Sequence, residues 1–115
     1  MIKRAHEMDV KFVENMRGGT GTVSIIHAVN QGEYKGKSRL IGKILLEPGC
    51  SIGRHVHENE EEIFYVLKGT AVFYDNDTRV ILHEGDSALT SDGQGHAIAN
   101  ESDQPLEIMA VILTY

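Results

Sequence analysis

The stretch that decides the fold is Gly49-Cys-Ser-Ile-Gly-Arg-His55-Val-His57-Glu-Asn-Glu-Glu-Glu62-Ile-Phe-Tyr-Val-Leu-Lys-Gly69. It places two histidines two residues apart. On an extended strand, His55 and His57 would point to the same face, with Cα atoms roughly 7 Å apart. Histidine pairs on a helix that share one metal have wider sequence spacing. The pair therefore indicates half of a metal site built on β-structure.

A carboxylate is expected as the third ligand, because several glutamates follow the histidines directly. The β-branched and aromatic run 63–67 predicts a strand. Glu62 would then begin that strand just past a hairpin, where its side chain can point back at the histidines. Glu61 is the alternative if the register is shifted by one, since adjacent strand residues face opposite sides. Glu58 and Glu60 are interpreted as parts of a solvated acidic turn.

Outward from this stretch, short apolar runs and turn signals alternate along the chain. Turn-forming residues recur about every 8–12 residues, and no segment has a sustained helical period. The prediction is an all-β fold, a small antiparallel β-barrel or jelly roll, formed by residues 1–115 as a single domain. Besides the metal-site region, strands are expected at 23–29, 39–46, 63–67, 70–74, 79–82, 87–90, 96–100 and 106–113.

The N-terminal region has a weaker pattern. Residues 1–16 mix charges with short apolar pieces and are interpreted as an edge strand or a swapped dimerisation arm. The glycine-rich segment 17–22 is expected to be a mobile loop. It lacks the Lys-Ser/Thr pair and the following helix of a phosphate-binding P-loop.

Composition narrows the classes of partner. The net charge of −6 argues against nucleic acid or an anionic membrane as the main partner, and leaves a small internal ligand open. The one cysteine, Cys50, is expected to be structural or incidental and suits a reducing compartment. Neither a signal peptide nor a membrane-spanning run is visible, so a cytoplasmic protein is expected.

A further ligand is needed, and four histidines are candidates. His96 follows a glycine-rich loop that lets the backbone turn sharply before a strand. His83 falls in an expected exposed turn, His27 on an apolar strand as a core or rim residue, and His6 on the N-terminal arm. Spacing alone favours His96 only modestly.

With both regions in view, the sequence resembles the cupin superfamily, in its small single-domain form. The first cupin motif is matched at every fixed position by Gly49, His55, His57, Glu62 and Gly69. The second motif is matched by Gly85, Gly93, His96 and Asn100, while Ser91 stands where the motif has proline. The loss of that proline is expected to loosen the mouth of the barrel.

The resemblance implies a double-stranded β-helix, or jelly roll, in which His55, His57, Glu62 and His96 bind one divalent transition metal. The expected metal is Mn, Fe, Ni, Co, Cu or Zn, because mixed nitrogen and oxygen ligands suit all of them. Four protein ligands would leave one or two positions open for a substrate. A purely structural metal is the alternative, although structural zinc sites are usually richer in cysteine. The resemblance also implies a homodimer that pairs sheets edge to edge.

Fold and metal do not determine a reaction. Strand parity places Phe64, Val66, Ile98 and Asn100 inward, which predicts a mainly apolar pocket and favours an aromatic, enol-like substrate over oxalate. Further polar groups could come from four residues near the expected pocket: Arg39, Lys43, Gln94 and Tyr34.

Two hypotheses follow. The first is a metalloenzyme acting on a small enol-like, aromatic or carboxylate substrate. A dioxygenase-like reaction is favoured over decarboxylation or isomerisation, and Glu62 would also serve as a catalytic base. The alternative is a non-catalytic protein that binds or senses a small molecule through its metal.

Overall fold

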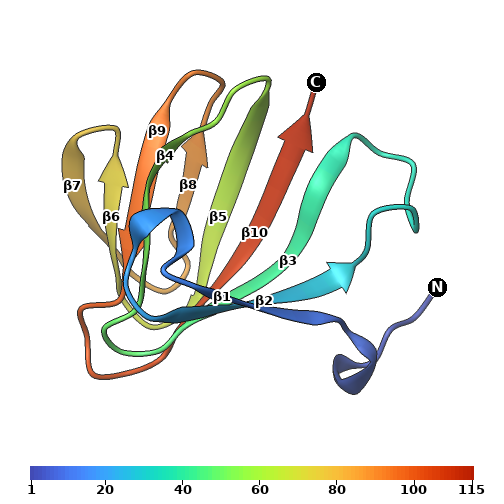
Figure 1. Cartoon of the computed structure of the whole chain (residues 1–115), viewed down its shortest axis with the longest axis horizontal. Coiled ribbons are helices and arrows are strands. Elements are labelled where there is room, and N and C mark those ends of the chain that lie inside the picture. Colours follow the sequence, from blue (N-terminus) through green and yellow to red (C-terminus); the bar gives the residue numbers. More distant parts are fainter.

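Two antiparallel sheets make up the fold (Figure 1). In the computed structural model, which describes residues 1–115, the six-stranded sheet has the order β1-β2-β3-β10-β5-β8 and the four-stranded sheet the order β4-β9-β6-β7. The strands are β1 (Val10–Glu14), β2 (Thr22–Val29), β3 (Ser38–Leu46), β4 (Ser51–Val56), β5 (Glu60–Lys68), β6 (Ala71–Asp75), β7 (Thr78–Leu82), β8 (Ser87–Thr90), β9 (Gly95–Ala99) and β10 (Leu106–Thr114). The predicted all-β jelly roll is confirmed. Only two short 3-10 turns, η1 (Ala5–Glu7) and η2 (Met16–Gly18), interrupt it, and no helix is long and apolar enough to cross a membrane.

The strands form because apolar residues alternate along them. On β5, the side chains of Glu62, Phe64 and Val66 are buried, while Tyr65 and Leu67, at alternate positions, are about half exposed. Because the pattern repeats every two residues, every second side chain points toward the opposite sheet. Apolar residues from both sheets meet in one core: Val23, Ile25, Ile44, Leu46, Ile52, Phe64, Val66, Ala71, Phe73, Leu82, Ile98, Leu106, Ile108 and Ala110.

The first motif passes between the two sheets. β4 pairs with β9 in the four-stranded sheet, whereas β5 pairs with β10 and β8 in the six-stranded sheet. The turn at 57–59 is therefore a crossover, and the expected hairpin between His57 and Glu62 is wrong. Asn59 makes the turn with a φ of 59°, a left-handed conformation that asparagine tolerates.

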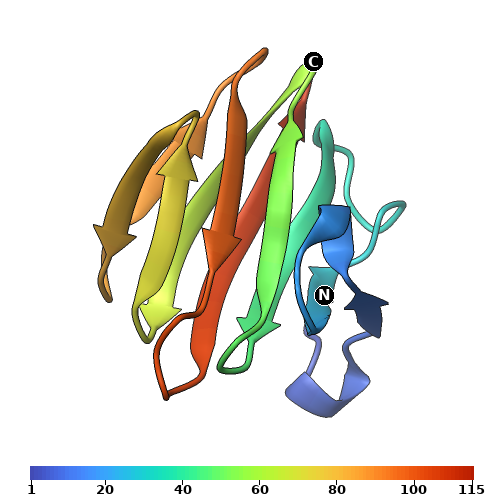
Figure 2. The same ribbon diagram turned by 60° about the vertical axis from the view of Figure 1, so that its left-hand side comes forward.

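The glycine-rich segment 17–22 lies against β4 (Figure 2). The Ser51 backbone N–H donates to the Thr20 carbonyl at 2.8 Å, and the Thr20 N–H donates to the Ser51 hydroxyl at 2.9 Å. A Cβ atom on Gly19 would collide with the Ser51 carbonyl, and one on Gly53 with the Arg17 carbonyl. The close approach therefore requires glycine on both sides. The segment that was expected to be a mobile loop is a packed connection.

Asn100 closes the turn between β9 and β10. Its buried side-chain amide donates to the carbonyls of Leu46 and Gln104, and its Oδ1 accepts from the backbone N–H and the hydroxyl of Ser102. Asn100 points inward as expected, but it does not line the pocket. Its role is to satisfy backbone groups, which corrects the prediction that it faces a ligand.

Candidate metal centre

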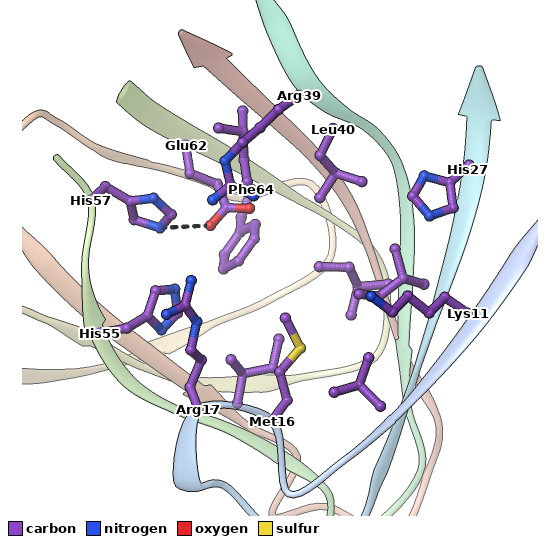
Figure 3. Close-up of a pocket in the computed structure, with 15 residues that line it drawn as sticks. Lys11, Met16, Arg17, His27, Arg39, Leu40, His55, His57, Glu62 and Phe64 are labelled. Atoms are coloured by element: carbon purple, nitrogen blue, oxygen red, sulfur yellow. Dashed lines mark ion pairs between the residues drawn. The ribbon is translucent and has the colours of Figure 1, made fainter. Parts of the chain in front are cut away.

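Four side chains from the two sheets converge at one point: His55, His57, Glu62 and His96. The ligand-type atoms of this cluster, three imidazole nitrogens and a carboxylate oxygen, all lie within 4.8 Å of one another. Nε2 of His96 is 3.0 Å from Nε2 of His57 and 3.1 Å from Nε2 of His55. Oε1 of Glu62 is 3.0 Å from Nε2 of His57, the contact dashed in Figure 3, and 3.1 Å from Nε2 of His96. The structure therefore brings together all four residues that the motifs single out.

Strand register explains the convergence. His55 and His96 are direct cross-strand partners on β4 and β9. Just past β4, His57 is fixed by two backbone hydrogen bonds to the loop between β8 and β9. The His57 N–H donates to the Gln94 carbonyl, and the Gly93 N–H donates to the His57 carbonyl. The opposite sheet contributes Glu62, which is 4% exposed. The alternative Glu61 faces the other side of the sheet, so the register excludes it.

Each histidine is oriented through its second ring nitrogen. Nδ1 of His55 donates to the Gly53 carbonyl at 2.8 Å, and Nδ1 of His57 donates to Oε2 of Glu60 at 2.6 Å. Nδ1 of His96 lies 2.8 Å from the hydroxyl of Thr90, which is the cross-strand partner of Glu62. Such contacts hold the ring and its tautomer so that Nε2 faces the cluster.

The donor chemistry of the cluster fits a cation. Because Gly53 and Glu60 only accept, neutral His55 and His57 carry their protons on Nδ1 and present Nε2 lone pairs. Both lone pairs and the Glu62 carboxylate face Nε2 of His96, which can donate to only one of them. Lone pairs at these distances repel one another unless a positive ion lies between them. Three imidazoles and a carboxylate suit a divalent transition metal.

Glu60 corrects the sequence interpretation, which placed it in a solvated turn. Its carboxylate accepts two hydrogen bonds from Arg39, both at 2.7 Å, as well as the one from His57. Hydrogen bonding from Arg39, with His57 contributing, lowers the pKa of Glu60 to about 2. Glu60 therefore remains ionised and holds His57 in place. Glu58, its neighbour in the turn, is exposed as expected.

Within the cluster, the hydrogen bond to Glu62 raises the pKa of His57, while burial lowers the pKa of His55. Burial alone would raise the pKa of Glu62, but the hydrogen bonds that protonated rings of His57 and His96 donate to it outweigh burial, and the net shift is downward. The carboxylate is thus held in its anionic form, as metal binding requires.

A cavity of about 420 Å³ opens onto the cluster (Figure 3). Its wall contains 15 residues: Lys11, Val13, Met16, Arg17, Ile25, His27, Arg39, Leu40, Ile44, Ile52, His55, His57, Glu62, Phe64 and Ile112. Arg39 lines the cavity, as sequence reasoning allowed. The other three candidates, Lys43, Gln94 and Tyr34, do not, because Lys43 pairs with Glu107, Gln94 closes its own loop and Tyr34 bonds to the Ser38 carbonyl.

The prediction of a mainly apolar pocket is only half right. Phe64 lines the cavity, but Val66 and Ile98 lie in the core behind it. Two cationic side chains, Lys11 and Arg17, also line the cavity, and neither has an ion-pair partner. Sequence reasoning missed both because they lie in the weakly patterned N-terminal region. The one available signal was that Lys11 and Val13, two residues apart, would share a face of a short strand.

The loop of the second motif compensates for its missing proline. The backbone N–H of Ser91 donates to the side chain of Gln94 at 3.0 Å, and the Gln94 N–H donates back to the Ser91 carbonyl at 3.0 Å. Proline has no N–H and could not make the first bond. A second link joins the two motif loops, from the Asn59 N–H to the Asp92 carboxylate.

The model of the cupin domain family (Cupin_2) matches residues 42–112, which include all four residues of the cluster. The chain belongs to the cupin family. This cupin is 40% identical over 113 residues to the "Oxalate-binding protein" of Thermotoga maritima, a match that covers 98% of this chain and 93% of the relative. It also resembles a crystal structure described as "a predicted oxalate decarboxylase" from the same organism, with a TM-score of 0.94, 39% identity and full coverage of both chains.

More distant structures share the fold alone. A polyketide cyclase from Streptomyces resistomycificus superposes with a TM-score of 0.77 at 20% identity, covering 99% of this chain and 80% of the cyclase. Since such different chemistry occurs on the same architecture, the function must be argued from the residues of the cavity.

Proposed function

We propose that this cupin binds one divalent transition metal through His55, His57, Glu62 and His96 and, through the metal, a small carboxylate of the oxalate class. The observation that carries the proposal is the convergence of three imidazole nitrogens and one carboxylate oxygen within 4.8 Å at the wall of an open cavity. Without a cation, their lone pairs would face one another in a largely buried site.

The charges around the cavity favour an anionic ligand. A divalent ion with one ligating carboxylate leaves a net positive charge. Arg17 adds another unpaired cation beside His55, while Arg39 is already neutralised by Glu60 (Figure 3). Burial is the main cause that lowers the pKa of His55, and Coulombic repulsion from Arg17 adds to it. The Thermotoga maritima relative, named for oxalate binding, is consistent with this ligand class.

The residues of this chain have separable roles. A bound metal would supply a Lewis acid with free positions for carboxylate oxygens. Arg17 is placed to bind the outer oxygens of the ligand, and Arg39, through Glu60, holds the ring of His57. Apolar side chains such as Phe64, which stacks on His96 at 5.0 Å between ring centroids, reduce the water around the site.

The test measures metal content and ligand binding together. Protein freed of metal and reloaded should take up one equivalent of Mn²⁺ or Co²⁺, and the loaded form alone should bind oxalate in a calorimeter. His96→Ala should lose both properties, whereas His83→Ala, at an exposed turn, should keep them. Oxalate binding that persists without metal would contradict the proposal, as would the absence of stoichiometric metal uptake.

The second candidate function is catalytic turnover of a small substrate at the metal. The observation that favours it is the cavity itself, since free metal positions would face a space of about 420 Å³ next to the ionised Glu62 carboxylate, a candidate base. Dioxygenase-like cleavage of an enol-like or aromatic substrate and decarboxylation of a carboxylate remain predictions. Oxygen consumption and CO2 release by protein loaded with each candidate metal distinguish turnover from binding alone.

We also propose that two copies of this single domain form a homodimer through the outer face of the six-stranded sheet, in place of the edge-to-edge pairing that the resemblance implied. Strand parity places six exposed apolar side chains on that face: Val10, Phe12, Tyr65, Leu67, Leu89 and Leu113. Extended apolar faces of this kind usually mark interaction sites. A second copy would bury the same face on both partners, as two-fold symmetry requires.

A further inference from the structure

The cavity has a second polar end, away from the metal cluster. Figure 3 shows His55 and His57 on one side of the cavity and Lys11 and His27 on the other. The second pair comes from β1 and β2, which reach the cavity from the far edge of the six-stranded sheet.

By register, Lys11 lies on the inner face of β1, although the residue itself remains exposed. On β1 it shares a face with Val13, whose cross-strand partner is the fully buried Val23, and its own partner Ile25 belongs to the core. No carboxylate forms an ion pair with Lys11. One role of an inward-pointing lysine on an edge strand is simply to discourage that edge from pairing with another sheet. A lysine that lines a cavity and has no ion-pair partner is equally placed to receive an anion.

The wall between the two ends is apolar. Met16 and Leu40 lie between the histidine cluster and Lys11 in Figure 3, and Val13 and Ile25 also line the cavity. A ligand that spans this space must carry charge at its ends and a hydrocarbon chain between them, because a buried charge without a partner is costly.

The strand order separates the two ends of the cavity. From β5, which carries Glu62, to β2, which carries His27, the sheet order takes three steps. At about 4.8 Å a step, the strands are roughly 14 Å apart along the sheet, and β1 lies one step further. Side chains from both ends fill part of that distance. The two carboxyl carbons of oxalate are bonded to each other, so a ligand that contacts both ends would need a hydrocarbon chain between its carboxylates.

From these observations we infer that the ligand of this cavity is a 2-oxo dicarboxylate with a chain longer than oxalate. Its 2-oxo carboxylate end would take the free metal positions beside Arg17, and its distal carboxylate would bind Lys11. The inference rests on the proposed function, since the first half of the ligand is the oxalate-like metal chelate.

The experiment compares matched pairs of acids that differ only in the distal carboxylate. The affinity of Mn²⁺-loaded protein is measured by calorimetry for 2-oxoglutarate against 2-oxopentanoate, 2-oxoadipate against 2-oxohexanoate, and 2-oxopimelate against 2-oxoheptanoate, with oxalate as a reference. In at least one pair, the dicarboxylate should bind about tenfold tighter or more, the effect of one charged hydrogen bond. Lys11→Gln should abolish that ratio, and Lys35→Gln, at an exposed position without an ion pair, should preserve it.

The ratio of two affinities is unaffected by a general loss of folded protein, so a partly unfolded variant cannot imitate the result. Equal binding within every pair overturns the inference but leaves the proposed function intact, provided that oxalate binds. A preference for dicarboxylates that survives in Lys11→Gln also overturns it. If neither oxalate nor any 2-oxo acid binds the loaded protein, both the proposed function and the inference fail.

Discussion

Glu60 connects a cavity arginine to the metal cluster, although it is not one of the four converging residues. Its carboxylate is held by Arg39 and receives the Nδ1 proton of His57. We predict that Glu60→Gln weakens metal binding by about 10- to 100-fold, the usual effect of removing such an outer partner. The measurement is a competition titration of metal affinity with a chelator.

Glu58→Gln is the matched control, because Glu58 is an exposed carboxylate in the same turn. It removes the same charge without touching a histidine and should leave metal affinity nearly unchanged. Equal losses in the two variants would mean that general charge, rather than orientation of His57, explains the effect.

Gly19 is the residue that lets the segment with Arg17 approach β4. A Cβ atom there would collide with the backbone at Ser51 and Gly53, so neither side can yield without moving the main chain. We predict that Gly19→Ala costs about 1–3 kcal/mol of unfolding free energy, as overpacking does. Gly36→Ala, where a Cβ atom meets nothing within 4 Å, should be close to neutral. Urea denaturation of both variants checks the contrast, and a neutral Gly19→Ala would show that the segment is not packed in solution.

At the scale of elements, the turn between β9 and β10 depends on one buried amide. Asn100 makes four hydrogen bonds, two as donor and two as acceptor, and is 1% exposed. We predict that Asn100→Leu lowers the free energy of unfolding by about 2–4 kcal/mol, because it leaves the carbonyls of Leu46 and Gln104 without their partner. The loss is measured by chemical denaturation.

Ser102→Ala is the control for this turn. It removes the hydroxyl that bonds to Asn100 and Gln104 but leaves both buried donor contacts of the amide in place. Its loss should be clearly smaller than that of Asn100→Leu. If the two losses are equal, the hydroxyl rather than the amide holds the turn.

Sequence reasoning was most accurate in predicting the individual strands. Each strand expected from alternation exists, with ends that differ by up to three residues, as at the start of β5. The error was the crossover at 57–59. A polar turn between two apolar runs looks the same whether it joins partners in one sheet or leads to the opposite sheet, because turn chemistry is local and strand pairing is not.

For the whole molecule, the outer face of the six-stranded sheet predicts self-association. Leu89 is 55% exposed on that face, opposite Ile63. We predict that the native chain has twice the monomer mass by light scattering, and that Leu89→Glu shifts it to the monomer, since an unpaired charge in an apolar interface is costly. Val80→Glu, on β7 of the other sheet and 38% exposed, should not change the mass. A native protein that is monomeric at high concentration would contradict the homodimer.

The sequence by itself determined the all-β class and, through its resemblance to the two cupin motifs, singled out the four residues of the cluster. Period-two alternation orients a strand locally, and histidines two apart must share a face. Only the tertiary structure decided what surrounds that cluster. Glu60 turned out to hold His57, and two cations from the N-terminal segment, Lys11 and Arg17, turned out to line the cavity. The physical reason is that these contacts depend on a strand order and a glycine-to-glycine approach between distant parts of the chain, which no local pattern encodes.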